Sequence, residues 1–454
     1  MRTLLKPLSL ALFVAATLPT QSAYIRTSPP ANTIIPATGP SPHFCKTIGG
    51  PASEAGNSLI QTSDGGYAIA GNTSSFGAGE NDVYVVKLDA KGNLQWTKTI
   101  GGPDIDESQS LIQTSDGGYA IAGTTKSFGA GEPDVYVVKL DANGNLQWTK
   151  TIGGENWDVS FSIIQTSDGG YAIAGATKSF GAGEWDVYVV KLDAKGNLQW
   201  TKTIGGEKTD VGESLIQTSD GGYVIAGVTQ SFGAENPNVY VVKLDASGNL
   251  QWTKTIGGGK GETGESLIQT SDGGYAITGL TITFGAGKWD VYVVKLDANG
   301  NLQWTKTIGG PDYDQGKSLV QTSDGGYAIT GSTTSFGAGG EDVYVVKLDA
   351  KGNLQWTKTI GGPEDEKGNS LIQTSDGGYA IAGETKSFGA GKWDGHVVKL
   401  DKNGKACCAV SQTSQVGSGG RLRSPTSSIS SGGTLTTPPT PSTSSGGTLT
   451  NQCQ

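Results

Sequence analysis

Histidine, cysteine and methionine are scarce in this chain of 454 residues, which has two His, four Cys and one Met. With only His43 and His396 available, we expect neither a His-based metal cage nor a Ser-His-Asp set. The recurring Asp-Gly-Gly stretches also lack the alternating oxygen ligands of an EF-hand calcium loop. The sequence therefore indicates no catalytic residue, no metal site and no cofactor.

Basic charge and long apolar runs are lacking as well. The formal net charge is -9, whereas a nucleic-acid partner would require a basic face, so we expect none. The apolar segment at 8–18 is shorter than the roughly 20 residues that a membrane-spanning helix needs. With Arg2 and Lys6 before it and Ser22-Ala23 after it, this segment predicts a secretory signal peptide at 1–23. We therefore expect a secreted or cell-surface protein without a transmembrane span, and a monomer.

Glycine is abundant, with 72 residues, and much of it belongs to a repeat. The heptapeptide Gln-Thr-Ser-Asp-Gly-Gly-Tyr begins at Gln61 and recurs with a period of 52 residues, at 113, 165, 217, 269, 321 and 373. Apolar runs at 58–62, 67–71, 83–88 and 94–100, separated by Gly-rich turn signals, predict four short strands in each unit. Seven such units predict an all-β fold, a seven-bladed β-propeller of four-stranded antiparallel blades. A linear β-solenoid is the structural alternative.

The ends of the repeat array indicate how the ring closes. Residues 43–50 match 95–102, the second half of a fourth strand, so we expect this N-terminal strand to complete the seventh blade beside a C-terminal strand at 405–410. A disulfide from Cys45 to Cys407 or Cys408 would fasten the closure, contributing on the order of 5 kcal/mol. A vicinal bond between Cys407 and Cys408 is the alternative. The predicted organisation is signal peptide 1–23, linker 24–42, propeller 43–410 and a disordered Ser/Thr/Gly/Pro-rich tail 411–454.

The two faces of such a propeller differ in how much the repeats vary. The loops between strands one and two (Ser-Asp-Gly-Gly) and between strands three and four (Leu-Asp-Ala-x-Gly-Asn) barely change, and the surface that they form is called the invariant face here. The loops between strands two and three and between successive blades carry nearly all the variation and form the variable face. Per-repeat variation favours a binding face. Relaxed constraint on surface loops is the alternative.

Two sets of residues on the variable face are candidates for ligand binding. An acidic column could form a ring of carboxylates for a cation or polyol, or could accept bonds from backbone N–H groups of the loops; it comprises Glu54, Asp106, Asp158, Asp210, Glu262, Asp314 and Glu366. Loop tryptophans, each followed by Asp, could stack on a sugar whose hydroxyls the carboxylate binds, or could merely cover the next blade; this set comprises Trp157, Trp185, Asp186, Trp289, Asp290, Trp393 and Asp394.

A third set is predicted to be structural. One lysine interrupts each apolar third strand, and a buried ammonium must be matched by a counter-charge. We expect these lysines to pair with repeat carboxylates such as Asp64 or Asp89; they are Lys87, Lys139, Lys191, Lys243, Lys295, Lys347 and Lys399. The strand tryptophans, typified by Trp96, are expected to pack between blades.

The repeat, with Gly-Tyr-Ala-Ile-Ala-Gly, Val-Tyr-Val-Val-Lys-Leu-Asp-Ala-x-Gly-Asn and then Trp, resembles that of secreted prokaryotic propeller proteins and is more distantly similar to kelch and quinoprotein Trp-motif blades. The resemblance implies the fold over about 44–408. Kelch-type copper oxidases would imply Tyr and His ligands, and quinoprotein dehydrogenases eight blades with an adjacent Cys pair. Two isolated His and seven units do not fit these patterns.

These features together favour a secreted, non-enzymatic binding or adhesion propeller that recognises a glycan or a cell-surface protein through its variable face. One alternative is an extracellular enzyme that acts on polysaccharide through loop carboxylates. The other is a purely structural surface protein.

Overall fold

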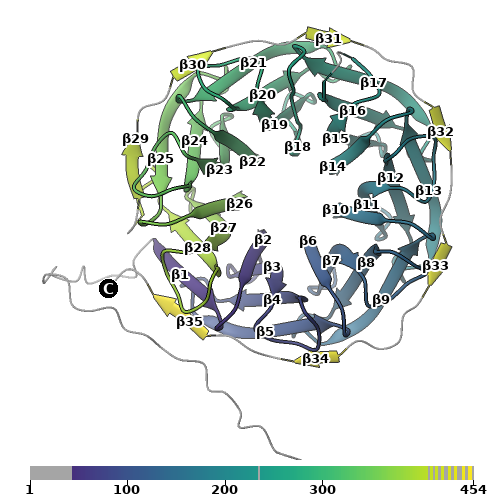
Figure 1. Cartoon of the computed structure of the whole chain (residues 1–454), viewed down its shortest axis with the longest axis horizontal. Coiled ribbons are helices and arrows are strands. Elements are labelled where there is room, and N and C mark those ends of the chain that lie inside the picture. The colour runs from purple at the N-terminus through teal and green to yellow at the C-terminus, as the bar shows by residue number, and fades with distance from the viewer. Residues whose placement is uncertain are drawn as a thin grey trace, which may run out of the picture.

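The computed structural model describes residues 43–233, 236–406, 409–412, 415–417, 421–423, 428–430, 434–436, 442–444 and 448–451. Over this part of the chain all regular structure is β, and seven blades of four antiparallel strands form a closed ring (Figure 1). The predicted fold class is thereby confirmed. The predicted signal peptide and linker lie outside the described residues.

Each blade runs from an inner strand near the ring axis to an outer strand at the rim (Figure 1). The first blade consists of β2 (Glu54–Gln61), β3 (Tyr67–Thr73), β4 (Asp82–Leu88) and β5 (Leu94–Gly101). The second consists of β6 (Asp106–Gln113), β7 (Tyr119–Thr125), β8 (Asp134–Leu140) and β9 (Leu146–Gly153), and the third of β10 (Asp158–Gln165), β11 (Tyr171–Thr177), β12 (Asp186–Leu192) and β13 (Leu198–Gly205). The fourth consists of β14 (Asp210–Gln217), β15 (Tyr223–Thr229), β16 (Asn238–Leu244) and β17 (Leu250–Gly257), and the fifth of β18 (Ser266–Gln269), β19 (Tyr275–Thr281), β20 (Asp290–Leu296) and β21 (Leu302–Gly309). The sixth consists of β22 (Asp314–Gln321), β23 (Tyr327–Thr333), β24 (Asp342–Leu348) and β25 (Leu354–Ile360), and the seventh of β26 (Glu366–Gln373), β27 (Tyr379–Thr385), β28 (Asp394–Leu400) and β1 (Phe44–Gly49).

The Ser-Asp-Gly-Gly loop makes the tight hairpin that starts each blade. Gly65 has a φ of 80°, in the left-handed region that glycine adopts without steric cost, and its N–H donates to the Thr62 carbonyl at 2.8 Å. The Asp64 carboxylate accepts the Gly66 N–H at 2.9 Å and so holds the second half of the turn. Local sequence chemistry therefore fixes the register of the first two strands.

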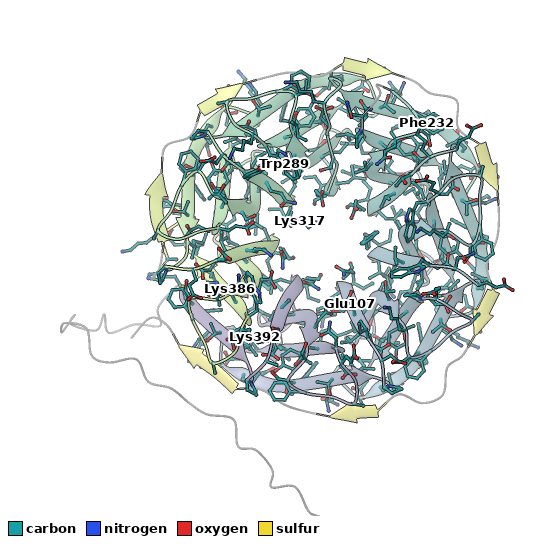
Figure 2. All side chains as sticks on the ribbon, viewed as in Figure 1. Glu107, Phe232, Trp289, Lys317, Lys386 and Lys392 are labelled. Carbon is teal, nitrogen blue, oxygen red and sulfur yellow. The ribbon has the colours of Figure 1, made fainter. Side chains whose placement is uncertain are left out.

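The core lies between blades. Every residue of β4 is buried, as are its counterparts in β8 and β12, because a third strand is covered by both neighbouring blades. Side chains of adjacent blades meet in the spaces between the sheets (Figure 2), where Val83 and Val85 of the first blade pack with Ile121 of the second. Trp96 meets Tyr119 of the next blade edge-to-face, with ring centroids 5.7 Å apart. The strand tryptophans thus pack between blades as predicted.

The N-terminal strand closes the ring. β1 pairs antiparallel with β28 of the seventh blade, with Cys45 opposite Val398. Phe44 stands in the place of the strand tryptophans and meets Tyr67 of the first blade edge-to-face at 5.8 Å. The closure predicted from the match of 43–50 to 95–102 is confirmed.

The predicted partner of this strand needs correction. The segment 405–410 was expected to lie beside β1 in the seventh blade, but β29 (Ala409–Gln412) instead pairs with β25, the outer strand of the sixth blade. The physical reason is that β1 already occupies the edge of β28 and a later strand of the tail pairs with the outer edge of β1, so the seventh blade has no edge left for β29. Cys45 is fully buried and carries no free thiol, whereas Cys407 and Cys408 lie outside the described residues, and their bond to Cys45 stays a prediction.

The tail differs from the expected disordered segment in seven short stretches. From β29 onward the tail strands lie at the rim in the reverse order of the blades, and each adds a fifth antiparallel strand to one sheet (Figure 1). The further strands are β30 (Gln415–Gly417), β31 (Arg421–Arg423), β32 (Ser428–Ser430), β33 (Thr434–Thr436), β34 (Ser442–Ser444) and β35 (Thr448–Asn451). The outer strands offer unpaired N–H and C=O groups, which lets a segment too polar to form a core pair with them.

Candidate functional site

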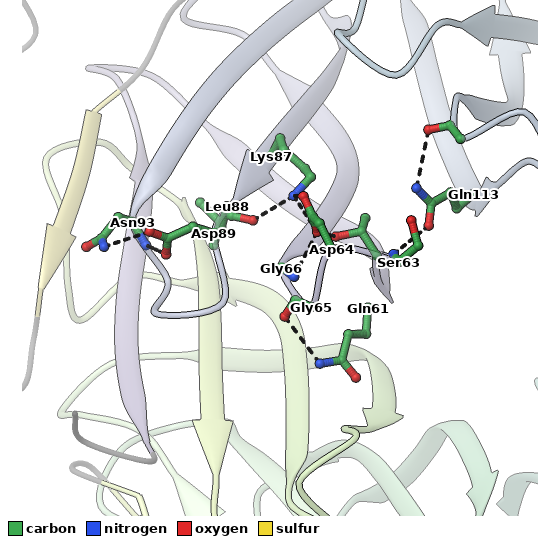
Figure 3. A network of polar contacts seen from close by, with 12 residues as sticks. Gln61, Ser63, Asp64, Gly65, Gly66, Lys87, Leu88, Asp89, Asn93 and Gln113 are labelled. Atoms are coloured by element: carbon green, nitrogen blue, oxygen red, sulfur yellow. Dashed lines mark hydrogen bonds and ion pairs between the residues drawn. The ribbon is translucent and has the colours of Figure 1, made fainter. Parts of the chain in front are cut away.

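The lysines of the third strands stabilise the hairpin loops of the invariant face. The Lys87 ammonium, in β4, lies 2.8 Å from the Asp64 carboxylate and donates to the Leu88 carbonyl at 3.0 Å (Figure 3). All seven repeats make the same ion pair, at 2.8–3.0 Å. Partial burial opposes ionisation of Asp64, but its bonds from Lys87, Thr62 and Gly66 prevail and lower its pKa to about 2. The prediction of a paired, structural lysine is confirmed.

A groove opens on this face between the first and second blades. Its volume is about 630 Å³ at the first junction, where Asp64, Gln95 and Trp96 of the first blade face Gln113 and Tyr119 of the second. The Gln113 side chain accepts the Ser63 N–H at 2.8 Å and ties the two blades together (Figure 3). Sequence reasoning treated the face only as scaffold and missed the groove, since its walls come from two repeats.

The acidic column of the variable face is buried, with each carboxylate residue at most 1% exposed. Asp106 accepts bonds from the Gly102 N–H and the Ser127 hydroxyl, both at 2.7 Å. Its own N–H donates at 2.7 Å to the carbonyl of Asn81 in the preceding blade. Equivalent bonds from the glycine N–H recur for Glu54, Asp158, Asp210, Glu262, Asp314 and Glu366. The structure thus places the column inside the blade junctions and away from a ligand in solution.

The loop aspartates are also turned inward. Asp186, Asp290 and Asp394 are only 1–2% exposed, and the Asp186 carboxylate accepts the N–H groups of Ala182 and Gly183 at 2.9 Å. The structure therefore does not bring an indole and its neighbouring carboxylate together at the surface. The sequence could not show this, because adjacent residues in an extended segment point in opposite directions.

Burial raises the pKa of aspartates at the start of the third strands, of which Asp134 in β8 and Asp394 in β28 are examples. Burial and the nearby Asp158 raise the pKa of Asp134 to about 6, against the bond from the Ala130 N–H. Burial and Glu54 act in the same way on Asp394 and raise its pKa to about 6. The fourth blade has Asn238 at the equivalent position, a neutral amide in place of an acid.

The tryptophans of the variable face remain accessible, and three of them are flanked by lysines. Trp157 and Trp289 are 39% and 37% exposed. The Lys126 ammonium lies 5.4 Å from the Trp157 ring, within the range of a cation–π interaction. Trp393 has two such neighbours, Lys367 at 4.8 Å and Lys386 at 4.4 Å, and Trp185 lies 4.6 Å from Lys178.

One charged cluster on the inner strands was not anticipated. Lys317 of β22, which lies at the inner rim of the ring (Figure 2), bonds Glu265 at 2.6 Å. Burial and Glu265 raise the pKa of Glu213, on β14, to about 7 despite the attraction of Lys317. The available signal was the variation at this inner-strand position between repeats, as in Glu213, Glu265 and Lys317. Among the described residues, no group of three or more His, Cys, Asp or Glu is arranged to hold a metal ion.

A comparison with known families identifies the family to which the chain belongs. A family model described as outer membrane protein assembly factor BamB matches residues 81–320, more than half of the sequence. The chain belongs to this PQQ-like repeat family. A second model, described as a haemagglutinin repeat, matches 52–102 and 311–358, which form propeller strands in the structure.

A curated relative is the regulatory protein FlaEY of Caulobacter vibrioides, 26% identical over 415 residues. The match covers 79% of this chain and 41% of the relative, so the chain spans about two fifths of that protein's length. No helix in the described part of the chain is long and apolar enough to cross a membrane.

Solved structures with a similar arrangement are distant. The WD40 domain of Neurospora crassa Pan2 has a TM-score of 0.46 at 13% identity, covering 77% of this chain and 89% of that one. The NanB sialidase of Streptococcus pneumoniae has a TM-score of 0.38 at 10% identity, covering 78% and 69%.

Proposed function

We propose that this propeller is a non-enzymatic binding module, secreted or displayed at the cell surface, whose variable face recognises a surface protein or glycan. The observation that carries the proposal is the exposure of Trp157 and Trp289 on a face whose repeat carboxylates are buried. Aromatic residues are enriched where proteins bind partners, and Trp157 stands beside the Lys126 ammonium, which can bond an incoming acceptor.

The differences among the blade junctions support a single, asymmetric partner. Trp157 lies by Lys126, whereas Trp289 meets Tyr313 edge-to-face at 5.6 Å. Lys288 lies 5.0 Å from the Tyr313 ring and 3.1 Å from the Asp312 carboxylate. The junctions at Trp157 and Trp289 present different groups, so a ligand made of identical units would not fit them equally. A folded protein or a branched glycan has the matching irregularity.

Burial of the loop aspartates argues against a simple sugar clamp. A tryptophan that stacks on a sugar needs a nearby polar group for the hydroxyls, and Asp186, Asp290 and Asp394 do not reach the surface. The lysines beside Trp185 and Trp393 are the accessible polar groups. A glycan on this face would therefore be bound through acceptor oxygens, such as acidic substituents.

The inner-strand cluster favours one second candidate, an extracellular enzyme acting on polysaccharide. Glu213 with a pKa of about 7 would retain a proton to donate, and Glu265, paired with Lys317 at 2.6 Å, would supply a second carboxylate. Glycoside hydrolysis uses two carboxyl groups in these roles. Hydrolysis of soluble polysaccharides that disappears in Glu213→Gln, with retention of folding, would establish this candidate.

Two assays test the binding proposal. Labelled propeller is applied to a glycan array and to intact bacterial cells with and without prior protease treatment, together with the double variant Trp157→Ala/Trp289→Ala. We expect the double variant to lose at least tenfold in apparent affinity, with loss of cell binding after protease identifying a protein partner. Lys91→Ala, in an exposed loop of the opposite face, is the matched control. A folded wild-type protein that binds neither glycans nor cells would refute the proposal.

A further inference from the structure

One exposed glutamine on the invariant face is identical in six blades, and packing does not explain this identity. Gln95 is exposed, and so is the same Gln of β9, β13, β17, β21 and β25. Buried positions are identical between blades because neighbouring sheets must fit, but an exposed side chain has no such constraint. Loops on the opposite face have diverged in the same seven units, so the identity of the exposed glutamines indicates a requirement shared by all junctions.

Gln95 lies in the groove at the first junction, beside an aromatic surface that the fold holds rigid. Trp96 is half-buried and is fixed edge-to-face against Tyr119 at 5.7 Å. Its indole also packs against Gly144, where a Cβ would lie 3.0 Å from the ring. An amphipathic ring held in one orientation is a platform that a ligand can contact without ordering the side chain first.

The polar groups of the groove are arranged for an uncharged ligand. Lys87 is almost entirely buried and its charge is matched by Asp64 at 2.8 Å, so this pair leaves neither sign of charge in excess. The Asp64 side chain is 56% exposed, and its Oδ2 retains acceptor capacity beyond the bond from Lys87. With the Gln95 amide, the groove offers both a donor and acceptors beside an indole, which is the chemistry that hydroxyl groups on an apolar ring require.

We infer that the invariant face carries six equivalent subsites, one at each junction of this kind, that bind neutral hexose units of a polysaccharide or a dense glycan. The inference is independent of the partner proposed for the variable face. The first subsite consists of Asp64, Gln95 and Trp96. The other five consist of the equivalent residues at successive intervals of 52, and the last is Asp324, Gln355 and Trp356. The six Trp–Tyr contacts at 5.7–6.3 Å show the same wall at each junction.

The seventh junction differs because ring closure brings His43 and Phe44 to the places of Gln and Trp. It therefore lacks the amide and has no indole. Identical sites on one rigid ring suit a ligand that repeats, because each further contact is made at a high effective concentration. Weak individual sites would then give firm attachment to a polymer and little retention of a single sugar.

Glutamine variants test this inference without disturbing the core. Binding is measured on an array of neutral gluco-, galacto- and manno-oligosaccharides and in native gels containing the corresponding soluble polysaccharides. We expect Gln95→Ala alone to weaken gel retardation less than threefold and Gln95→Ala/Gln147→Ala/Gln199→Ala to weaken it more than tenfold. Titration with an oligosaccharide that scores on the array should give about six sites per chain, as follows from the six equivalent junctions.

Two controls separate this inference from the proposal for the variable face. Trp157→Ala/Trp289→Ala should bind neutral polysaccharide as the wild type does, and the triple glutamine variant should keep wild-type cell binding through the other face. The inference is overturned by absence of retardation in every neutral polysaccharide, by a triple variant that binds unchanged, or by a stoichiometry of one. Far-ultraviolet circular dichroism confirms that each variant is folded.

Discussion

At the scale of single residues, the buried aspartates at the start of the third strands give the fold an unusual pH dependence. Burial and a neighbouring carboxylate raise the pKa values of Asp134 and Asp394 from 3.8 to about 6. Since the folded-state pKa lies above the unfolded one, the contribution of the protonated form is complete below pH 3.8 and is lost as the pH rises through 6. Asn238 shows that an uncharged group fits this position.

We therefore expect Asp134→Asn or Asp394→Asn to raise the free energy of unfolding at pH 7.5 by about 1–3 kcal/mol. At pH 3.5, where the wild-type acid is protonated in both states, the same substitution should change little. Urea unfolding at the two pH values measures the difference. An equal effect at both would show that the folded protein does not retain these protons.

The salt-bridged aspartate of the hairpin should behave in the opposite way. The bonds from Lys87, Thr62 and Gly66 lower the pKa of Asp64 to about 2 against the effect of partial burial, so its contribution is present above pH 3.8 and is lost as the pH falls through 2. Asp64→Asn should cost about 1–2 kcal/mol at pH 7, a modest amount because the carboxylate is half-exposed. Thermal melts at pH 7 and pH 2 should show this loss only at the higher pH. Lys91→Ala, in the exposed neighbouring loop, is the control and should be neutral at both.

At the scale of elements, the two glycines of one hairpin turn should respond differently to alanine. Gly65 has open space around its Cα and a φ of 80°, so Gly65→Ala should cost only the strain of a left-handed residue, about 1 kcal/mol. A Cβ on Gly66 would lie 2.3 Å from the Leu88 carbonyl oxygen and 2.7 Å from the Lys87 ammonium. Gly66→Ala should therefore displace β4 and cost roughly 3 kcal/mol. Urea midpoints of the two variants test the order, and equal midpoints would contradict it.

The elements also show what local patterns can reveal. The second strand was predicted at 67–71 and the structure has Tyr67–Thr73, because alternating apolar residues and a glycine turn define it locally. The first strand was predicted from 58 but begins at Glu54, whose N–H bonds the Trp393 carbonyl of another blade at 2.9 Å. A contact between neighbouring blades leaves no local signal. For the same reason the groove at Trp96, whose walls come from two blades, could not be predicted, whereas the Lys87–Asp64 pair, made within one repeat, could.

At the scale of the whole molecule, ring closure depends on β1 and on what holds it. Cys45 is buried in a cluster that Ala406 packs against, and Ala406 immediately precedes Cys407. We therefore predict a disulfide from Cys45 to Cys407 or Cys408, closing a loop of about 360 residues and contributing on the order of 5 kcal/mol. Peptide mapping under non-reducing conditions should recover the Cys45 peptide joined to the 407–408 peptide. A free Cys45, or a vicinal bond between Cys407 and Cys408, would contradict the prediction.

The tail strands at the rim should determine whether the protein stays monomeric or assembles. Removing the chain after Gln412 leaves β29 in place but uncovers the outer strands of six blades, including β5 and β1, which pair with β34 and β35. Open edges recruit strands from other molecules, so the truncated protein should scatter light and elute in large species while its isolated ring keeps the same fold. Removal of 452–454 alone, beyond the last strand, is the control and should change nothing. Addition of a synthetic 413–454 peptide should suppress the assembly, because the edges accept it antiparallel as they accept the tail. A truncated chain that elutes as the full-length protein does would show that the blade edges need no cover.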